Sequence, residues 1–304
     1  MMNKRVKQIL SVFLGAGMLF GCSQASEDSS QANGKDWPEE ITVVQYTNEE
    51  NENTPAMHDE FRQHLENELG IKVEEFTGSG TYATAIEGMA AEEIDVLLVS
   101  PQSFSQAKEK AGAELFATID SDTDYYSSFI TQADNEDINN LDDLKGKNFA
   151  FADPSSSSGY LYPKATLIKD LSLDNDKLEQ SGYFFENVVF SGSHDNSIIG
   201  VSMGDYDAAA VASTVLKRLI DAGGVDEKSI KEVARSVDIP NAAYAVRGNL
   251  PDDLKQAIQE AFLSFDDGKY FEALYGKPET RFTAIDDSYY DEAVEAMRIA
   301  GGEE

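Results

Sequence analysis

The chain alternates between short apolar runs and amphipathic stretches, and this alternation restricts its fold more than any other feature. Residues 41–46 are apolar and β-branched, as in a strand, and Phe61, Leu65 and Leu69 then recur every four positions, which indicates one helical face. Gly70 follows at the point where such a helix is expected to end. Repeated strand–helix alternation predicts an α/β fold with mostly parallel sheets and helices on both faces.

The same pattern continues towards the C-terminus and predicts two lobes. Further strands are expected at residues 71–76, 94–99, 115–119, 148–152, 187–190, 207–212 and 242–246. Further helices are expected at residues 81–91, 104–112, 159–170, from the turn at 191–196 to about 203, and at 213–222, 251–264, 267–275 and 288–300. We expect residues 39–126 and 239–304 to form the first lobe and residues 127–238 the second, with two chain crossings as a hinge. The ligand site is then expected in the cleft, at the carboxyl ends of strands.

The first 21 residues predict an export signal. Lys4, Arg5 and Lys7 precede an apolar stretch that is too short to span a bilayer as a stable helix. Cys22, the only cysteine, comes directly after a small residue, and this arrangement resembles a bacterial lipobox. We therefore expect cleavage before Cys22 and lipidation of that cysteine, followed by a flexible tether over residues 22–38. The protein is expected on the outer face of the cell membrane, or on the periplasmic side in a host with two membranes.

The charge of the chain excludes some classes of partner. It has 24 Lys and Arg against 56 Asp and Glu, for a formal net charge of −32. Nucleic acids and anionic membrane surfaces are bound through basic faces, so neither is an expected partner. Strong negative charge keeps proteins apart, so we expect a monomer. We expect no metal and no cofactor.

Serine-rich turns follow several of the expected strands, and one of them predicts an anion site. The turn at residues 155–159 lies between a strand and a helix, a layout that offers hydroxyls, unpaired N–H groups and the positive end of the helix dipole to an anion. Similar turns occur at residues 80–82, 100–104 and 191–196. A single turn of this kind is usually only a helix cap, whereas four that face one cleft favour a binding site.

These turns also carry a resemblance to a known family. Residues 153–163, DPSSSSGYLYP, resemble the Ser-Thr-Ser-Gly signature of phosphate, phosphite and phosphonate ABC-transporter substrate-binding lipoproteins. Segments 95–107, 190–195 and 204–211 resemble three further segments of that family, and the similarity covers nearly all of residues 41–275. The resemblance implies a two-lobed periplasmic-binding-protein type II fold. It also implies a receptor, not an enzyme, that closes around a phosphorus oxyanion and delivers it to an ABC permease in the membrane.

By position, the resemblance implies eight ligand-binding residues. In the second lobe they are expected to donate hydrogen bonds to the ligand or to contact a ligand amine, and in the first lobe to close over it: Ser156, Ser157, Ser158, Gly159, His194 and Asp195, with Tyr82 and Ser103. Ser157 stands where the family usually has threonine. Ala212 stands where members that hold an aminoalkyl group often have an acidic or amide residue, which favours phosphite, phosphate or a small alkylphosphonate.

Several alternatives stay open at this stage. The same fold could hold a sulfonate, a sulfate or an organic phosphate. Hard oxygen donors could make a ferric-ion site from Tyr82, Tyr160, His194 and Asp153. An extracellular hydrolase could use Ser156 or Ser157 with His194 and Asp207, although the chain has no Gly-x-Ser-x-Gly motif. His194 could also be a solvated turn residue, and Asp153 could serve only to fix its turn.

Overall fold

The computed structural model describes residues 36–44, 55–76, 82–119, 124–275 and 277–301, and of residues 55–58 and 275 only the backbone. All helices and strands of the described residues belong to one compact unit, Trp37–Glu304. The predicted export signal, Cys22 and most of the tether therefore lie outside the described residues. Within the described ranges, none of the helices combines the length and the apolar character needed to cross a membrane.

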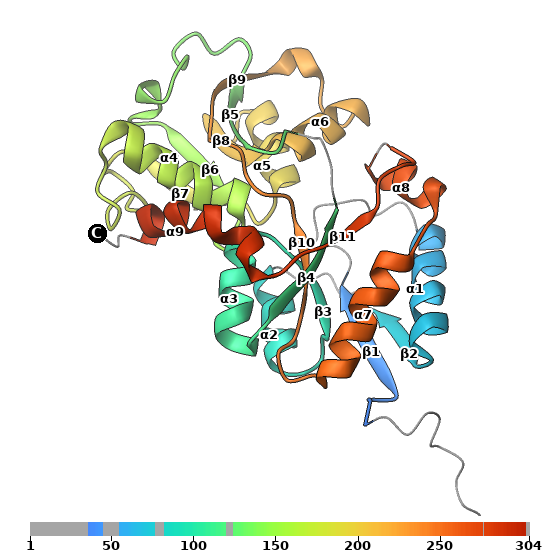
Figure 1. The fold of residues 1–304 in the computed structure, drawn as a ribbon. Helices are drawn as coiled ribbons and strands as arrows, with labels where there is room; N and C mark the ends of the chain where they lie inside the picture. The colour runs from blue at the N-terminus through green and yellow to red at the C-terminus, as the bar shows by residue number, and fades with distance from the viewer. Residues whose placement is uncertain (1–35, 45–54, 77–81, 120–123, 276, 302–304) are drawn as a thin grey trace, which may run out of the picture. The chain divides into compact units, whose positions relative to one another are not determined.

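The first of two sheets has six strands in the order β11-β4-β10-β3-β1-β2 (Figure 1). The pairs of β1 with β2 and β3 are parallel, whereas β10 is antiparallel to β3 and β4, and β11 is antiparallel to β4. The strands are β1 Glu40–Val44, β2 Lys72–Glu75, β3 Val96–Val99, β4 Glu114–Ile119, β10 Ala243–Val246 and β11 Phe282–Ala284.

Helices cover both faces of this sheet and bury separate apolar clusters against it. On one face lie α1 Pro55–Leu69, α7 Asp252–Ser264 and α8 Gly268–Tyr275, with Phe61 packed edge-on against Phe262. The other face is covered by α2 Tyr82–Ala90, α3 Pro101–Ala111 and α9 Val294–Gly301. The apolar stripe predicted on the first helix therefore faces the core.

The second sheet has five strands in the order β7-β6-β8-β5-β9. The pairs of β6 with β7 and β8 are parallel, and β5 is antiparallel to β8 and β9. All five residues of β8 are buried, and four of them are alanines, so neighbouring elements can approach this strand closely. The elements are β5 Ser127–Gln132, β6 Asn148–Phe151, β7 Asn187–Phe190, β8 Ala208–Ala212, β9 Ile230–Arg235, α4 Tyr162–Leu171, α5 His194–Met203 and α6 Ser213–Asp221.

The predicted α/β class with two layered sheets is confirmed, but the sheets are mixed and not mostly parallel. Every antiparallel pair involves β5, β10 or β11. Of these strands the sequence periodicity predicted only β10, and it also missed β9. Parallel neighbours need a crossover helix between them. Both β5 and β10 instead enter their sheet from the other one, without such a helix, and so they run the opposite way.

The two segments that cross between the sheets pair with each other. The Ile239 N–H donates to the Tyr125 carbonyl at 2.7 Å, and the Ser127 N–H donates to Ser236 Oγ at 2.9 Å. Beyond these crossings, α9 packs against α4, with Ala296 in the same apolar cluster as Ala165. The C-terminal helix thus contacts a helix of the second sheet, although it belongs to the range predicted for the first lobe. The lobe boundaries themselves stay a prediction.

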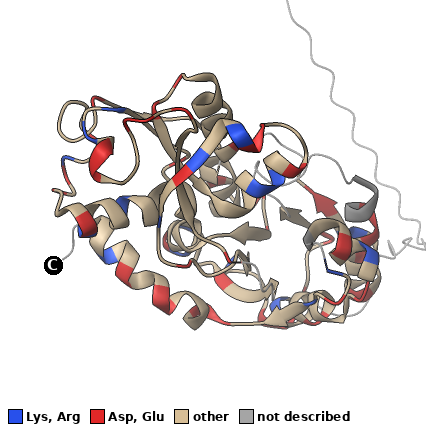
Figure 2. Ribbon diagram, turned by 90° about the horizontal axis from the view of Figure 1, so that it is seen from above, with Lys and Arg blue, Asp and Glu red and all other residues tan. Residues whose placement is uncertain are grey.

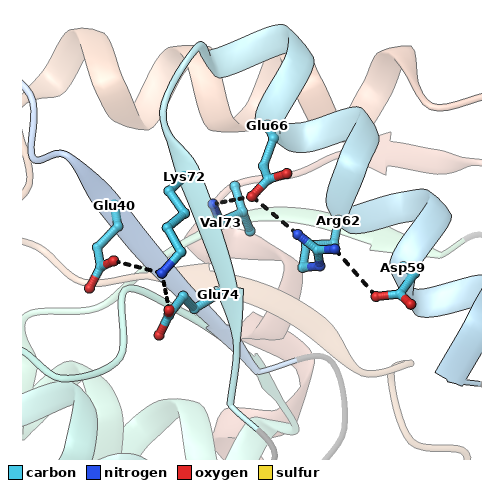
Figure 3. Close-up of polar contacts among 7 residues, drawn as sticks. All are labelled: Glu40, Asp59, Arg62, Glu66, Lys72, Val73 and Glu74. Atoms are coloured by element: carbon cyan, nitrogen blue, oxygen red, sulfur yellow. Dashed lines mark hydrogen bonds and ion pairs between the residues drawn. The ribbon is translucent and has the colours of Figure 1, made fainter.

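A polar network secures the outer edge of the first sheet (Figure 3). Glu66 of α1 accepts a hydrogen bond from the backbone N–H of Val73 in the edge strand β2 at 3.1 Å, and it also pairs with Arg62. Lys72 of the same strand pairs with Glu40 and Glu74. Exposed edge strands invite pairing with other chains, and charged side chains on the edge oppose such pairing.

Candidate functional site

The predicted serine turn forms a buried loop between β6 and α4. Ser156, Ser157 and Ser158 are each at most 1% exposed, and residues Ser157–Leu161 form a single π-helical turn, a feature that is frequent at functional sites. The Ser155 N–H donates to Asp153 Oδ1 at 2.8 Å. Asp153 therefore fixes the start of the loop, as one of the sequence alternatives held.

His194 packs against the serine loop from the first position of α5, and it is 1% exposed. The backbone N–H of Ala212, the last residue of β8, donates to His194 Nδ1 at 3.1 Å. In a neutral imidazole the other nitrogen, Nε2, then carries the hydrogen. This atom lies 3.3 Å from Ser156 Oγ and 3.2 Å from Ser158 Oγ, so His194 donates to the serine hydroxyls and is not a solvated turn residue.

The buried imidazole is neutral at physiological pH. Burial lowers the pKa of His194 to about 4, with a smaller lowering from Arg218 and opposing contributions from Asp195 and Asp153. The site therefore offers hydrogen-bond donors without a positively charged histidine. This fits a chain whose acidic side chains are spread along its helices and loops (Figure 2).

All three serine hydroxyls accept hydrogen bonds from the protein. Ser156 Oγ accepts from the Gly159 N–H at 3.0 Å, Ser157 Oγ from the Gln102 N–H at 2.9 Å, and Ser158 Oγ from the Tyr125 hydroxyl at 2.9 Å. A hydroxyl has one hydrogen to donate. Because its oxygen already accepts from the protein, each serine is oriented to donate that hydrogen to a further acceptor.

On the side of the first sheet, Ser103 belongs to the N-terminal cap of α3. Its hydroxyl accepts from the Ser100 N–H at 2.8 Å and lies 3.2 Å from the Ser100 carbonyl. Tyr82 is half-buried at the start of α2, next to residues 77–81, which lie outside the described ranges. Ligand contacts by Ser103 and Tyr82 stay predictions. A surface hollow beside α2 contains none of the predicted site residues; it is lined by Phe76, Ala83, Thr84, Glu87, Gly88, Ala91, Glu93 and Ile94.

The carboxylate of Asp195 faces the helix α6. Both of its oxygens accept from Arg218 Nη2 of α6 at 3.0 Å. Its position in the first turn of α5 also suits the positive end of that helix. A ligand amine would have to compete with Arg218 for this carboxylate, so the predicted contact with a ligand stays a prediction.

Three residues near the site were not anticipated from the sequence. Gln102 and Gln106 of α3 contact the serine loop from the first sheet, and Tyr125 reaches it from a crossing segment. The available signals were that Gln102 lies in the turn at residues 100–104 that was expected to face the cleft, that Gln106 lies in the expected helix after it, and that Tyr125 lies two residues before the predicted start of the second lobe.

The geometry argues against two of the alternatives. A hydrolase needs a histidine that takes the proton of the serine, but His194 Nε2 already carries a hydrogen, and Asp207 instead accepts from the Asn148 N–H at 2.7 Å. A ferric-ion site needs a tyrosinate, but the Tyr160 hydroxyl donates to Glu179, and burial raises the pKa of Tyr160 well above its usual value.

We predict that Gly159→Ala disrupts the loop. A Cβ at this position would lie 2.4 Å from the Ala152 Cβ and 2.8 Å from His194 Cε1, closer than carbon atoms pack. The variant should lose about 1–3 kcal/mol of unfolding free energy in urea denaturation, as expected for overpacking. Gly301→Ala is the control, because nothing lies within 4 Å of a Cβ there. Equal stability of the two variants would contradict the packing argument.

A second prediction concerns stability in acid. The folded-state pKa of His194, about 4, lies below the usual value of 6.5, so between these pH values the unfolded chain binds more protons. The contribution of His194, up to about 3 kcal/mol, should therefore be present above pH 6.5 and be lost as the pH falls towards 4.

The measurement is urea denaturation at pH 7 and pH 4.5 for the wild type and for His194→Gln. The many carboxylates affect the stability of both proteins alike, so the difference between the two proteins reports on His194. The wild type should lose more stability than the variant over this interval. His64→Gln, at a half-buried histidine, is the control and should behave as the wild type does. A loss of the same size in the wild type and in His194→Gln would refute the assignment.

Comparisons with known proteins agree with this geometry. A family model described as "ABC transporter, phosphonate, periplasmic substrate-binding protein" matches residues 43–290. The chain is 29% identical over 261 residues to the phosphate-import protein PhnD of Mycolicibacterium smegmatis, covering 84% of this chain and 81% of that protein.

Two solved structures show the same fold. One is a binding protein component of an ABC phosphonate transporter from Pseudomonas aeruginosa, with a TM-score of 0.74 and 22% identity over 88% of this chain and 87% of that one. The other is PhnD1 from Prochlorococcus marinus in complex with methylphosphonate, with a TM-score of 0.71 and 19% identity over 86% of this chain and 97% of that one. With the family model matching most of its length, the chain belongs to the phosphonate family of periplasmic substrate-binding proteins of ABC transporters, whose role is binding and not catalysis.

Proposed function

We propose that this protein captures a phosphorus oxyanion at the serine loop and delivers it to an ABC permease. The observation that carries the proposal is the common polarity of Ser156, Ser157 and Ser158, whose oxygens all accept from the protein. Their hydrogens are then available to P–O oxygens. Such neutral donors bind an anion without a cationic surface, and the N-terminal turn of α4 adds its dipole.

The donors favour a ligand that is fully deprotonated at its P–O groups. A phosphonate or phosphite dianion accepts at every oxygen, whereas a protonated P–OH group needs an acceptor. Asp153 is the carboxylate nearest in sequence to these serines, and one of its oxygens already accepts from Ser155. The dianions of methylphosphonate and phosphite therefore fit these donors best, whereas the phosphate dianion keeps one P–OH group that needs an acceptor. Methylphosphonate is also the molecule named for the Prochlorococcus marinus structure.

Capture proceeds by closure of the two sheets around the ligand. Tyr125 and Ile239 pair where the chain crosses between the sheets, which makes these segments the natural hinge. A ligand that contacts both sheets binds the closed arrangement more tightly than the open one. This difference in affinity sets how far the ligand shifts the population towards the closed arrangement. The same crossings support the proposed lobe division at residues 127 and 238.

Sulfate is the second candidate, and it is favoured by the same set of serine hydroxyl donors. Sulfate has no acidic hydrogen at neutral pH, so these donors suit it as well as they suit a phosphonate dianion. Sulfate and an alkylphosphonate differ in shape, because the alkylphosphonate carries one carbon substituent. The ligand panel described next includes both chemistries for this reason.

A thermal-shift panel tests the binding proposal. The ligands are phosphite, phosphate, methylphosphonate, 2-aminoethylphosphonate, sulfate, taurine and ferric citrate. A ligand at a hundred times its dissociation constant should stabilise the folded protein by about 2.7 kcal/mol. We expect this with one of the first three compounds, and we expect Ser157→Ala to abolish it, because that hydroxyl also contacts Gln102 of α3. A shift with taurine or ferric citrate alone would overturn the oxyanion assignment.

The protein is held at the membrane through lipidated Cys22. Support comes from the basic and apolar residues before this cysteine, from its being the only one, and from a family that works outside the cytoplasm. Cys22→Ala should move the protein from the membrane fraction to the soluble extracytoplasmic fraction, because the variant has no cysteine to carry the acyl chains that anchor it. A variant that stays in the membrane fraction would contradict lipidation at this residue. The monomeric state is part of the same proposal.

A further inference from the structure

Two glutamines on one face of α3 hold the serine loop from the opposite sheet, and they have no place in the ligand set. Gln102 and Gln106 are four residues apart, so their side chains lie side by side on the helix, and both are half-buried. α3 packs on the first sheet, whereas the loop they contact follows β6 of the second sheet. A hydrogen bond between α3 and the serine loop therefore exists only when the two sheets are close together.

The contacts fall on residues that flank or overlap the proposed ligand donors. Ser155 Oγ donates to Gln106 Oε1 at 2.8 Å, and the Gln102 N–H donates to Ser157 Oγ at 2.9 Å. A third and longer contact joins Gln102 Nε2 to the Pro154 carbonyl at 3.4 Å. These bonds connect protein to protein, so they stabilise the closed arrangement independently of a ligand.

We propose that Gln106 is a positioning residue that holds Ser155 and sets how often the two lobes close, and thereby the affinity for the oxyanion. The proposal rests on the proposed binding function. Gln106 acts through Ser155 and has no direct role in contacting the ligand. When the lobes separate, Gln106 and Ser155 are hydrated, so the Gln106 side chain contributes to the closed arrangement and not to the open one.

The expected effect follows from linkage. The apparent dissociation constant is the intrinsic one divided by the fraction of protein that is competent to bind tightly. A neutral hydrogen bond contributes enough to change an equilibrium about three- to tenfold. Gln106→Ala should therefore weaken binding about three- to tenfold. The loss should appear in the dissociation rate, because the ligand leaves through the open arrangement, while the association rate changes little.

The test measures dissociation constants by calorimetry and both rate constants by stopped flow, with the full-length chain in detergent. The probes are methylphosphonate, phosphite, phosphate and sulfate, each used separately. Gln259→Ala is the matched control: Gln259 is also half-buried and makes one side-chain bond, to the Phe116 carbonyl at 2.8 Å, but within the first sheet and its helices. It should leave binding unchanged, as a purely structural glutamine would.

A double-mutant cycle with Ser155→Ala identifies the partner. If Gln106 acts through the Ser155 hydroxyl, Gln106→Ala should have little further effect in the Ser155→Ala background. Additive losses in the two single variants would overturn the pairing, and an unchanged dissociation rate in Gln106→Ala would overturn the positioning role.

Hydrogen exchange of the ligand-free proteins separates this inference from the binding proposal. The amides of residues 155–157 should exchange faster in Gln106→Ala than in the wild type or in Gln259→Ala, since the loop is released more often. If the wild type bound none of the four probes, the oxyanion proposal would fail, and this measurement would still decide the glutamine contact. Equal exchange in Gln106→Ala and the wild type would then refute it.

Discussion

The hydrogen bond from the Ala212 backbone to His194 decides the polarity of two of the three serine hydroxyls at the site. Because this N–H occupies Nδ1, the imidazole has its single hydrogen at Nε2, and Ser156 and Ser158 accept from it. The hydroxyl hydrogens must then point to another acceptor. Burial reinforces this arrangement by lowering the pKa of His194, which prevents a second ring proton from occupying Nδ1. The bond forms because His194 begins α5 directly over the end of β8, a strand of small residues.

Neutral donors reconcile an oxyanion ligand with a chain of net charge −32. A cationic site in such a protein would attract the protein's own carboxylates, as the pairing of Arg218 with Asp195 illustrates. Hydroxyls and backbone N–H groups do not form such ion pairs, and their orientation is already set when the protein folds. Discrimination among anions then depends on how many donors each ligand satisfies and on pocket shape. The inferred glutamine contact adds a separate control, because it acts on lobe closure and not on ligand chemistry.

Most helices and the parallel strands could be predicted from the sequence, because each forms a local unit with its own periodicity. The strands β5, β9 and β11 were missed. β5 reads Ser-Ser-Phe-Ile-Thr-Gln, which is polar for a strand whose first five residues are buried. Its burial comes from β8 and β9 on either side, which are distant in the chain. The strand β10 was predicted, but its antiparallel direction against β3 and β4 is set by its entry from the second sheet, which local periodicity does not encode. For both reasons the sheets were expected to be mostly parallel.

By itself, the sequence determined the α/β class, the serine turn between a strand and a helix, and the family, since each depends on residues close together in the chain. Only the tertiary structure decided how the site works. The tautomer of His194 depends on an N–H 18 residues away, and the orientation of Ser157 depends on Gln102, 55 residues away. A hydrogen bond has a direction that residue types do not encode, because serine and histidine can each donate or accept. That direction is chosen only when folding brings a specific donor against a specific acceptor.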